Sequence, residues 1–218
     1  MHSKIFQILI NTSFLKTFIF NIHYLGIRGL SLPILIGKNV ELKCLKGNLE
    51  IKNCGFASIR IGTYIPGNIP SRTVSTFDNK GTIIFNGKTI LGVGTRFCNR
   101  GVVEFGDNFM ITANSSILCS NGIKFGNNCI VSWNCEIMDT DFHKIYNNKN
   151  ELLNKNSTIC FGDKNWLCSG VKILKNCKFS EETVIGANSC ISGKVFEESN
   201  CLICGNGKII KSNIKWEP

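Results

Sequence analysis

Two acids and a histidine lie within five positions of one short stretch, IMDTDFHKIY at residues 137–146. They are Asp139, Asp141 and His143, in a chain with only three histidines. A histidine can take up a proton near neutral pH because its reference pKa is about 6.5, and a neighbouring carboxylate can hold the ring and favour its charged form. Acids and a histidine can also ligate a metal ion. The stretch therefore suggests either a general base with acidic support or a metal site.

A metal site is the weaker of these two interpretations, because three groups on one loop do not complete a tetrahedral zinc site. The twelve cysteines fall singly along the sequence except for Cys201 and Cys204. A lone C-x-x-C without a second pair or a nearby histidine is weak evidence for zinc. We therefore predict no metal, and we interpret the cysteines as reduced, buried thiols in a cytosolic protein.

An apolar residue returns every six positions through much of the sequence, and this repeat predicts the elements that hold the loop. The C-terminal run is Phe161, Leu167, Ile173, Phe179, Ile185 and Ile191. Upstream, the same spacing occurs in groups of three, each followed by two extra residues: Phe85, Leu91 and Phe97; Phe105, Ile111 and Ile117; Phe125, Val131 and Ile137. The first members of these groups lie twenty residues apart. Three hexads therefore make one unit.

A period of six fits neither an α-helix nor a hairpin meander. It fits a solenoid whose coil has three short sides, with one inward apolar residue per side and a small residue at the corner four positions later. The corner positions are small or β-branched: Ser115, Cys129, Cys135, Val171, Cys177, Thr183, Ser189 and Val195. Gly and Asn recur beside them, as in FGDN, FGNN and IGAN. Both residue types tolerate the positive φ angles that tight corners require.

The chain is long enough for one substantial core with appendages. We predict an N-terminal helical segment at residues 1–34, a solenoid at 35–196 and a tail at 197–218. The repeat breaks at about 62–79 and at 139–158, which we interpret as loops. The cluster of acids and histidine stands at the start of the second break, where the chain leaves the solenoid.

Residues 1–22 are rich in Ile, Phe and Leu, but several polar side chains and Lys16 interrupt the run. The interruption argues against a membrane-spanning helix, and no cleavage site of small residues indicates a signal peptide. Two interpretations stay open. The segment packs on its own domain or on a neighbouring subunit, or it makes weak peripheral contact with an acidic membrane surface. Both are compatible with a cytoplasmic protein, in the second case one held at the inner face of the membrane.

The repeat resembles the left-handed parallel β-helix of the hexapeptide-repeat superfamily, and several motifs resemble its sugar O-acetyltransferases. These motifs are NWLCSG at 165–170, IGANSC at 185–190, GNGK at 205–208 and the most specific one, DTDFH at 139–143. Residues 20–42 further resemble members found in capsule and surface-polysaccharide synthesis. The resemblance implies an all-β fold with a short N-terminal helical segment and a C-terminal helical tail. It also implies a homotrimer that uses acetyl-CoA as acyl donor, with active sites in the clefts between neighbouring subunits.

The same resemblance implies roles for individual residues. His143 corresponds to the general base, and Asn114 falls near a position that helps to bind the acceptor. Lys208 and Lys211 lie where basic residues meet the phosphates of the coenzyme. Four residues correspond to positions that line the coenzyme: Trp166, Ser169, Ala187 and Ser192. The chain departs from the family pattern at Cys168, where Gly is usual, and in GNGK, which is one residue shorter than the usual turn.

Acetyl transfer from a thioester to a sugar hydroxyl needs a base, because a neutral alcohol is a poor nucleophile near pH 7. His143 suits that task, and Asp139 or Asp141 would favour the imidazolium that develops. The formal net charge of +10 favours a polyanionic partner, for which the phosphates of coenzyme A are a specific candidate. No motif that reads nucleic acid accompanies the charge, so we predict none. The sequence thus predicts an acetyl-CoA-dependent O-acetyltransferase acting on a sugar or a surface-polysaccharide precursor.

Two alternatives remain open. The enzyme could acetylate the amine of an amino sugar, or the solenoid could be a binding module without catalysis. In the second case His143 would be an exposed loop histidine and the two aspartates would be turn residues. Asn114 would then be a corner residue and Trp166 a packing residue.

Overall fold

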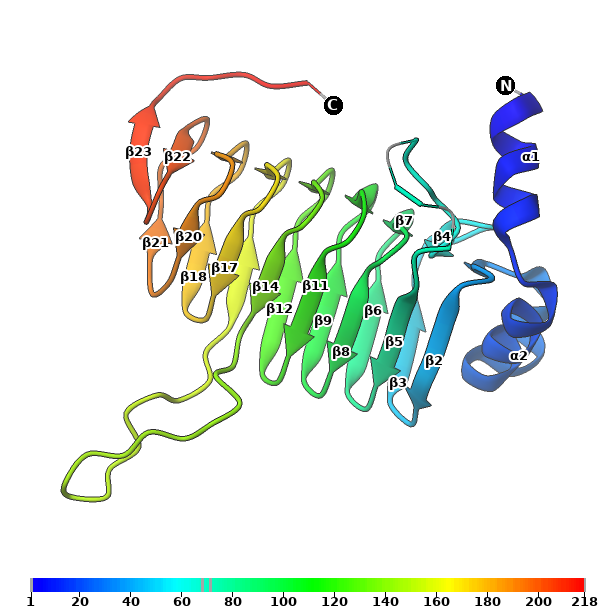
Figure 1. Ribbon diagram of the computed structural model, residues 1–218, viewed down its shortest axis with the longest axis horizontal. Coiled ribbons are helices and arrows are strands. Elements are labelled where there is room, and N and C mark those ends of the chain that lie inside the picture. Colours follow the sequence, from blue (N-terminus) through cyan, green and yellow to red (C-terminus); the bar gives the residue numbers. More distant parts are fainter. Residues whose placement is uncertain (1, 68, 71, 218) are drawn as a thin grey trace.

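The computed structural model describes residues 2–67, 69–70 and 72–217, and most of the chain winds into one β-helix (Figure 1). From β1 to β19, each strand pairs in parallel with the strand three elements later, so the coils stack into three sheets. The predicted fold class, an all-β left-handed parallel β-helix with an N-terminal helical segment, is confirmed.

The first sheet has nine strands: β1 Ile34–Ile36, β4 Ile59–Ile61, β7 Thr89–Leu91, β10 Phe109–Ile111, β13 Ile130–Val131, β16 Trp166–Leu167, β19 Val184–Ile185, β22 Leu202–Cys204 and β23 Lys208–Lys211. The second has seven: β2 Val40–Leu45, β5 Ser75–Asn79, β8 Arg96–Asn99, β11 Ser116–Cys119, β14 Glu136–Met138, β17 Lys172–Leu174 and β20 Cys190–Ile191. The third also has seven: β3 Asn48–Ile51, β6 Thr82–Phe85, β9 Val102–Phe105, β12 Gly122–Phe125, β15 Ile159–Phe161, β18 Cys177–Phe179 and β21 Val195–Phe196. We call the turn from the first to the second sheet the first corner, the next the second corner and the return to the first sheet the third corner.

The core is the column of side chains that the hexads predict. All fifteen predicted inward residues are at most 3% exposed. On the third sheet six of the core residues are phenylalanines in one stack: Phe85, Phe105, Phe125, Phe161, Phe179 and Phe196. Successive ring centroids lie 5.0 to 5.6 Å apart with planes within 13° of parallel. Each ring thus packs on its counterparts in the coils on either side, which adds aromatic stacking to the burial of apolar area.

The predicted corner residues are buried, with one exception. Val195 is 58% exposed, and its neighbour Phe196 takes the inward position opposite Phe179. The step from the inward residue Ile191 to the next one, Phe196, is therefore five residues and not six, because Gly193 turns the chain with a φ of 65°. A shift of one residue moves a strand's side chains to the opposite face, which explains why Val195 points outward.

Two boundaries differ from the sequence-based expectation. The predicted loop 62–79 contains β5, and Phe77 in that strand is fully buried with its ring 5.2 Å from Phe97. The connection between β4 and β5 is therefore shorter than predicted. Phe77 belongs to the core because it lies twenty residues before Phe97, in register with it.

In its described residues, 197–217, the tail contains no helix, which corrects the prediction of a C-terminal helical tail. It contributes β22 to the first sheet and then folds back as β23, which pairs antiparallel with β22. Gly205 and Gly207 make the reversal with φ angles of 63° and 93°, and Ile209 and Ile210 have the β-branched side chains that favour strands. Beyond β23 the chain runs on as an extended segment (Figure 1).

The N-terminal segment is helical, as predicted. It contains α1 His2–Asn11, α2 Phe14–Leu25 and a 3₁₀ helix at Gly26–Ser31. Ser13 caps α2 by accepting from the Lys16 amide at 3.5 Å. Both helices lie at the β1 end of the solenoid (Figure 1). Among the described residues, no helix has both the length and the hydropathy to cross a bilayer.

Truncating a ring in the phenylalanine stack should destabilise the fold. Phe125 is 1% exposed between Phe105 and Phe161, so we expect Phe125→Ala to lower the free energy of unfolding by about 3–5 kcal/mol, through lost apolar burial and the cavity left behind. Phe56 is 67% exposed, and Phe56→Ala should change the same quantity by no more than about 0.5 kcal/mol. Urea unfolding of both variants measures the difference. Equal stabilities would contradict the assignment of the stack to the core.

Candidate active site

The loop that carries the candidate base leaves the solenoid at the second corner. It runs from the end of β14 to the start of β15 and projects well beyond the other corners, as the yellow-green segment below the body of the helix in Figure 1. Its two arms are bridged by one antiparallel pair, Tyr146 with Leu152. A corner can accept such an insertion because the strands on either side keep their pairing with the neighbouring coils.

The root of the loop continues a ladder of buried side chains at the second corner. Its members lie twenty residues apart: Asn79, Asn99, Cys119 and Asp139. In the early coils, Asn99 donates to Asn79 Oδ1 at 2.9 Å and accepts from the Gly101 amide at 3.0 Å. The twenty-residue unit thus has one inward position more than three hexads supply. The ladder residues occupy this position and bind backbone groups of the second corner.

Asp139 fills this ladder position and forms no hydrogen bond or ion pair with the ring of His143, another described residue. Its Oδ1 accepts from the Ser120 amide at 2.6 Å, and its Oδ2 accepts from the amides of Asn121 and Gly122 at 2.8 and 2.6 Å. The side chain is fully buried. Three successive amides of one tight turn are satisfied by one carboxylate, which is a strong, charge-assisted arrangement. The expectation that Asp139 supports His143 is therefore corrected: Asp139 secures the corner from which the loop departs.

Asp141 anchors the loop through two residues that the sequence did not single out. Its Oδ2 accepts from Lys175 Nζ in a short ion pair and from Asn154 Nδ2 at 2.8 Å. Lys175 also donates to the Asn154 carbonyl at 3.0 Å. These contacts join the two arms of the loop to the next coil. The hydrogen bond from Lys175, and then that from Asn154, lower the pKa of Asp141, so the anchor holds above the usual aspartate range and is lost only as the pH falls below it.

His143 follows this anchor directly and is exposed. Its amide donates to the Asp141 carbonyl at 2.6 Å, and its own carbonyl accepts from Asn154 Nδ2 at 2.7 Å. The backbone is held on both sides, yet within the described part of the chain the imidazole makes no hydrogen bond. Four large apolar side chains on the same loop are also exposed: Phe142, Ile145, Tyr146 and Leu153.

The residues expected to bind the donor and acceptor lie mainly at the first corner and on the first sheet. Asn114, Ser169 and Ala187 belong to turns of the first corner, where the Ser169 carbonyl accepts from the Asn188 amide at 3.0 Å. Asn114 has a φ of 51°, so it serves as a corner residue whatever else it does. Ser192 differs, because it follows β20 at the second corner, one coil beyond Lys175.

Trp166 lies on the outer face of β16 and is half-buried under the C-terminal tail. Its Nε1 donates to Ser132 Oγ at 3.1 Å, and its ring centroid is 5.7 Å from that of Trp216. Trp166 is thus packed by its own chain. Lys208 and Lys211 stand on β23 with exposed side chains. The chain by itself therefore brings Asn114, Ser169 and Ala187 to one corner and His143 to another, with the whole second sheet between them.

The cysteines are free thiols, and five of the twelve are buried. Burial raises the pKa of Cys129 to about 12 and that of Cys135 to about 11, so both are protonated and poorly nucleophilic at neutral pH. They fill corners as small apolar side chains. Across the described residues no three His, Cys, Asp or Glu side chains gather in a group that could hold a metal ion.

No family model and no curated protein matches the chain, whereas several solved structures do. The polySia-specific acetyltransferase NeuO is 16% identical, with 83% of this chain and 89% of that chain covered and a TM-score of 0.49. The polysialic acid O-acetyltransferase OatWY is 20% identical, with 82% and 91% covered and a TM-score of 0.47. A mutant of AntD, an N-acyltransferase from Bacillus cereus in complex with a dTDP-sugar and coenzyme A, is 12% identical, with 83% and 80% covered and a TM-score of 0.48.

Replacing the Asp139 carboxylate should weaken the second corner. In Asp139→Asn one acceptor oxygen is exchanged for a donor that faces the amides of residues 120–122, so we expect a loss of about 1–3 kcal/mol in the free energy of unfolding. Glu197→Gln, at an exposed carboxylate, should leave it unchanged. Urea unfolding distinguishes the two. A variant of unaltered stability would show that the carboxylate is not the support of this corner.

Removing the cation of the loop anchor should loosen the loop without unfolding the solenoid. In Lys175→Met we expect tryptic cleavage after Lys144, Lys149 or Lys155 to be about fivefold faster than in the wild type, as roughly 1 kcal/mol of a partly exposed ion pair is lost. Lys172→Met, which removes an exposed lysine of the same strand region, is the control. Mass spectrometry of the fragments follows the cleavage, and equal rates in the two variants would contradict the anchor.

Proposed function

We propose that this chain is an acyltransferase that moves an acetyl group from acetyl-CoA to a hydroxyl of a sugar or surface-polysaccharide precursor, with His143 as the general base. The observation that carries the proposal is an exposed, unbonded imidazole whose backbone is fixed on both sides, at the start of a loop that the solenoid core does not need. A histidine held in this way is free to bind a hydroxyl proton with either ring nitrogen.

His143 would take the proton of the acceptor hydroxyl as its oxygen attacks the thioester carbonyl. The resulting tetrahedral intermediate collapses with cleavage of the carbon–sulfur bond, and the imidazolium returns the proton to the departing sulfur. Atoms and charges then balance, with an ester and a free thiol as products. Asp141 takes part as a positioning residue, because its Oδ2 accepts from Lys175 and Asn154 and thereby fixes the start of the loop.

The donor and acceptor residues we propose are those expected from the sequence. Asn114 would contact the acceptor, and Lys208 and Lys211 would meet coenzyme phosphates. Ser169, Ala187, Ser192 and Trp166 would line the coenzyme, Trp166 through the face that Trp216 leaves free. Because His143 and most of these residues lie at different corners of one chain, we propose that the site forms between copies in a homotrimer. The exposed apolar side chains beside His143 support this, since a neighbouring copy would cover them.

The proposal is tested by thiol release from acetyl-CoA in the presence of candidate glycans. We expect His143→Ala to lower kcat by about 10²- to 10⁴-fold, the usual contribution of a general base, while thermal stability stays unchanged. Lys149→Ala, at the exposed end of the same loop, should keep wild-type rates. Mass spectrometry before and after mild base separates an O-acetyl product from an amide. Wild-type transfer by His143→Ala would contradict the mechanism, and an amide product would reassign the acceptor to an amino sugar.

A further inference from the structure

The second helix turns two polar side chains toward the solenoid, beside one buried phenylalanine. The buried residues of α2 are Thr17, Phe20 and Asn21. Thr17 Oγ1 accepts from the Ile36 amide at 2.9 Å, while Asn21 accepts from the Ile34 amide at 3.2 Å and donates to its carbonyl at 2.7 Å. The polar side chains therefore face the solenoid, where they bind the free edge of β1. The exposed side of the helix carries mainly Phe, Leu and Ile.

The outward face of both N-terminal helices is apolar and exposed. Nine large apolar side chains between residues 6 and 30 are at least 39% exposed: Phe6, Leu9, Ile10, Phe14, Leu15, Phe18, Ile19, Ile27 and Leu30. We call them the N-terminal apolar face. Seven of them lie on α1 and α2, and Ile27 and Leu30 lie on the 3₁₀ helix. Scattered apolar residues on a surface are normal, but so many on consecutive short helices need a non-aqueous partner.

The charged residues within the N-terminal segment itself are all basic. No Asp or Glu occurs before Glu41, whereas Lys4, Lys16, Arg28 and Lys38 precede it. A second copy of the chain would bring the same cations against each other, which disfavours pairing of two such faces. An anionic surface is the complementary partner, and amphipathic helices with basic margins bind such surfaces by combining apolar burial with charge attraction.

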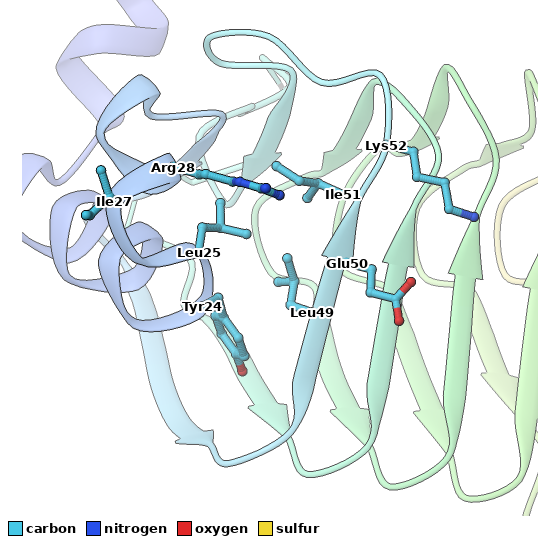
Figure 2. Close-up of a pocket in the computed structure, with 8 residues that line it drawn as sticks. All are labelled: Tyr24, Leu25, Ile27, Arg28, Leu49, Glu50, Ile51 and Lys52. Carbon is cyan, nitrogen blue, oxygen red and sulfur yellow. The ribbon is translucent and has the colours of Figure 1, made fainter.

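A pocket beside the face fits the same partner. It measures about 630 Å³ and lies between the helical segment and β3 (Figure 2). Tyr24, Leu25 and Leu49 line its interior, and Arg28 extends across it toward Ile51. Within the described residues Arg28 forms no salt bridge, and the carboxylate of Glu50 is directed away from the pocket in Figure 2. The lining combines four apolar side chains, Leu25, Ile27, Leu49 and Ile51, with the cations of Arg28 and Lys52. This combination is suited to a phosphate that bears an apolar chain.

We infer that the N-terminal apolar face docks on an anionic phospholipid bilayer, with Arg28 at the level of the headgroups. The helices of ten and twelve residues lie on the surface and do not cross it. This places the solenoid at a membrane and is independent of the acyl transfer proposed above. An acyltransferase held there would meet acceptors that are themselves attached to lipid.

Flotation with lipid vesicles tests the inference on the full chain. We expect the wild type to float with phosphatidylcholine vesicles that contain roughly one-third phosphatidylserine and to float less with phosphatidylcholine alone. The double variant Phe14→Ser with Phe18→Ser should bind the anionic vesicles at least about tenfold more weakly, since two exposed aromatic anchors are lost. Val195→Ser removes a similarly exposed apolar side chain at the other end of the solenoid and should bind as the wild type does.

A second variant keeps the test decisive if the serine variant folds poorly, which circular dichroism detects. Arg28→Gln should weaken binding to anionic vesicles about fivefold and leave binding to neutral ones unchanged. Failure of the wild type to float, or equal flotation of the wild type and both variants, would overturn the inference. It would also be overturned if light scattering showed the serine variant to break up an oligomer that does not bind vesicles, because the face would then join copies of this chain.

Discussion

The structure depends on one constraint: in each coil, the side chain of a given position must stack on the same position of the coils above and below. Parallel pairing in fixed register imposes this, because backbone hydrogen bonds to both neighbours leave no freedom to slide. The aligned rings of Phe105, Phe125 and Phe161 are its clearest expression. The core is thus a column that only neighbouring coils share, and a coil can change outside the column at little cost to the rest.

This separation explains how a long loop can leave the solenoid without disrupting it. β14 and β15 keep their partners in adjacent coils, and the ladder at the second corner ends in a carboxylate that binds three amides of the preceding turn. Beyond Asp139 the chain is released from the column and then fixed again by Asp141, Asn154 and Lys175. The β-helix is rigid, Asp139 secures the corner where the loop begins, and Asp141, Asn154 and Lys175 fix the first part of the loop. The backbone of the exposed His143 is therefore held in place, as a functional residue on a loop requires.

Period six in the sequence was sufficient to predict a three-sided solenoid and its buried column, because one inward residue per side leaves a direct trace. The left-handed β-helix itself came from the resemblance to the hexapeptide-repeat superfamily. The twenty-residue spacing also identifies two further buried residues. Phe77 lies twenty residues before Phe97 and belongs to the core, and Asp139 lies twenty after Cys119 and belongs to the ladder. The anchor could not be predicted, since Lys175 and Asn154 meet Asp141 only through the folded path of the loop. Two local turns also escaped prediction: the side of the coil before Phe196 is one residue short, and the chain reverses direction at Gly205. Both depart from the six-residue period, and no other pattern in the sequence marks them.

The two ends of a stacked solenoid pose a problem that its middle does not have, since a terminal strand exposes unpaired amides and carbonyls. At the C-terminal end β23 covers the edge of β22 with backbone hydrogen bonds. At the N-terminal end a helix must do this with side chains, and Thr17 and Asn21 supply the donors and acceptors that β1 needs. That use commits the polar face of α2 to the interior. The apolar side chains of α2 are exposed because its polar side chains are used to close the solenoid. A bilayer surface would cover these apolar side chains.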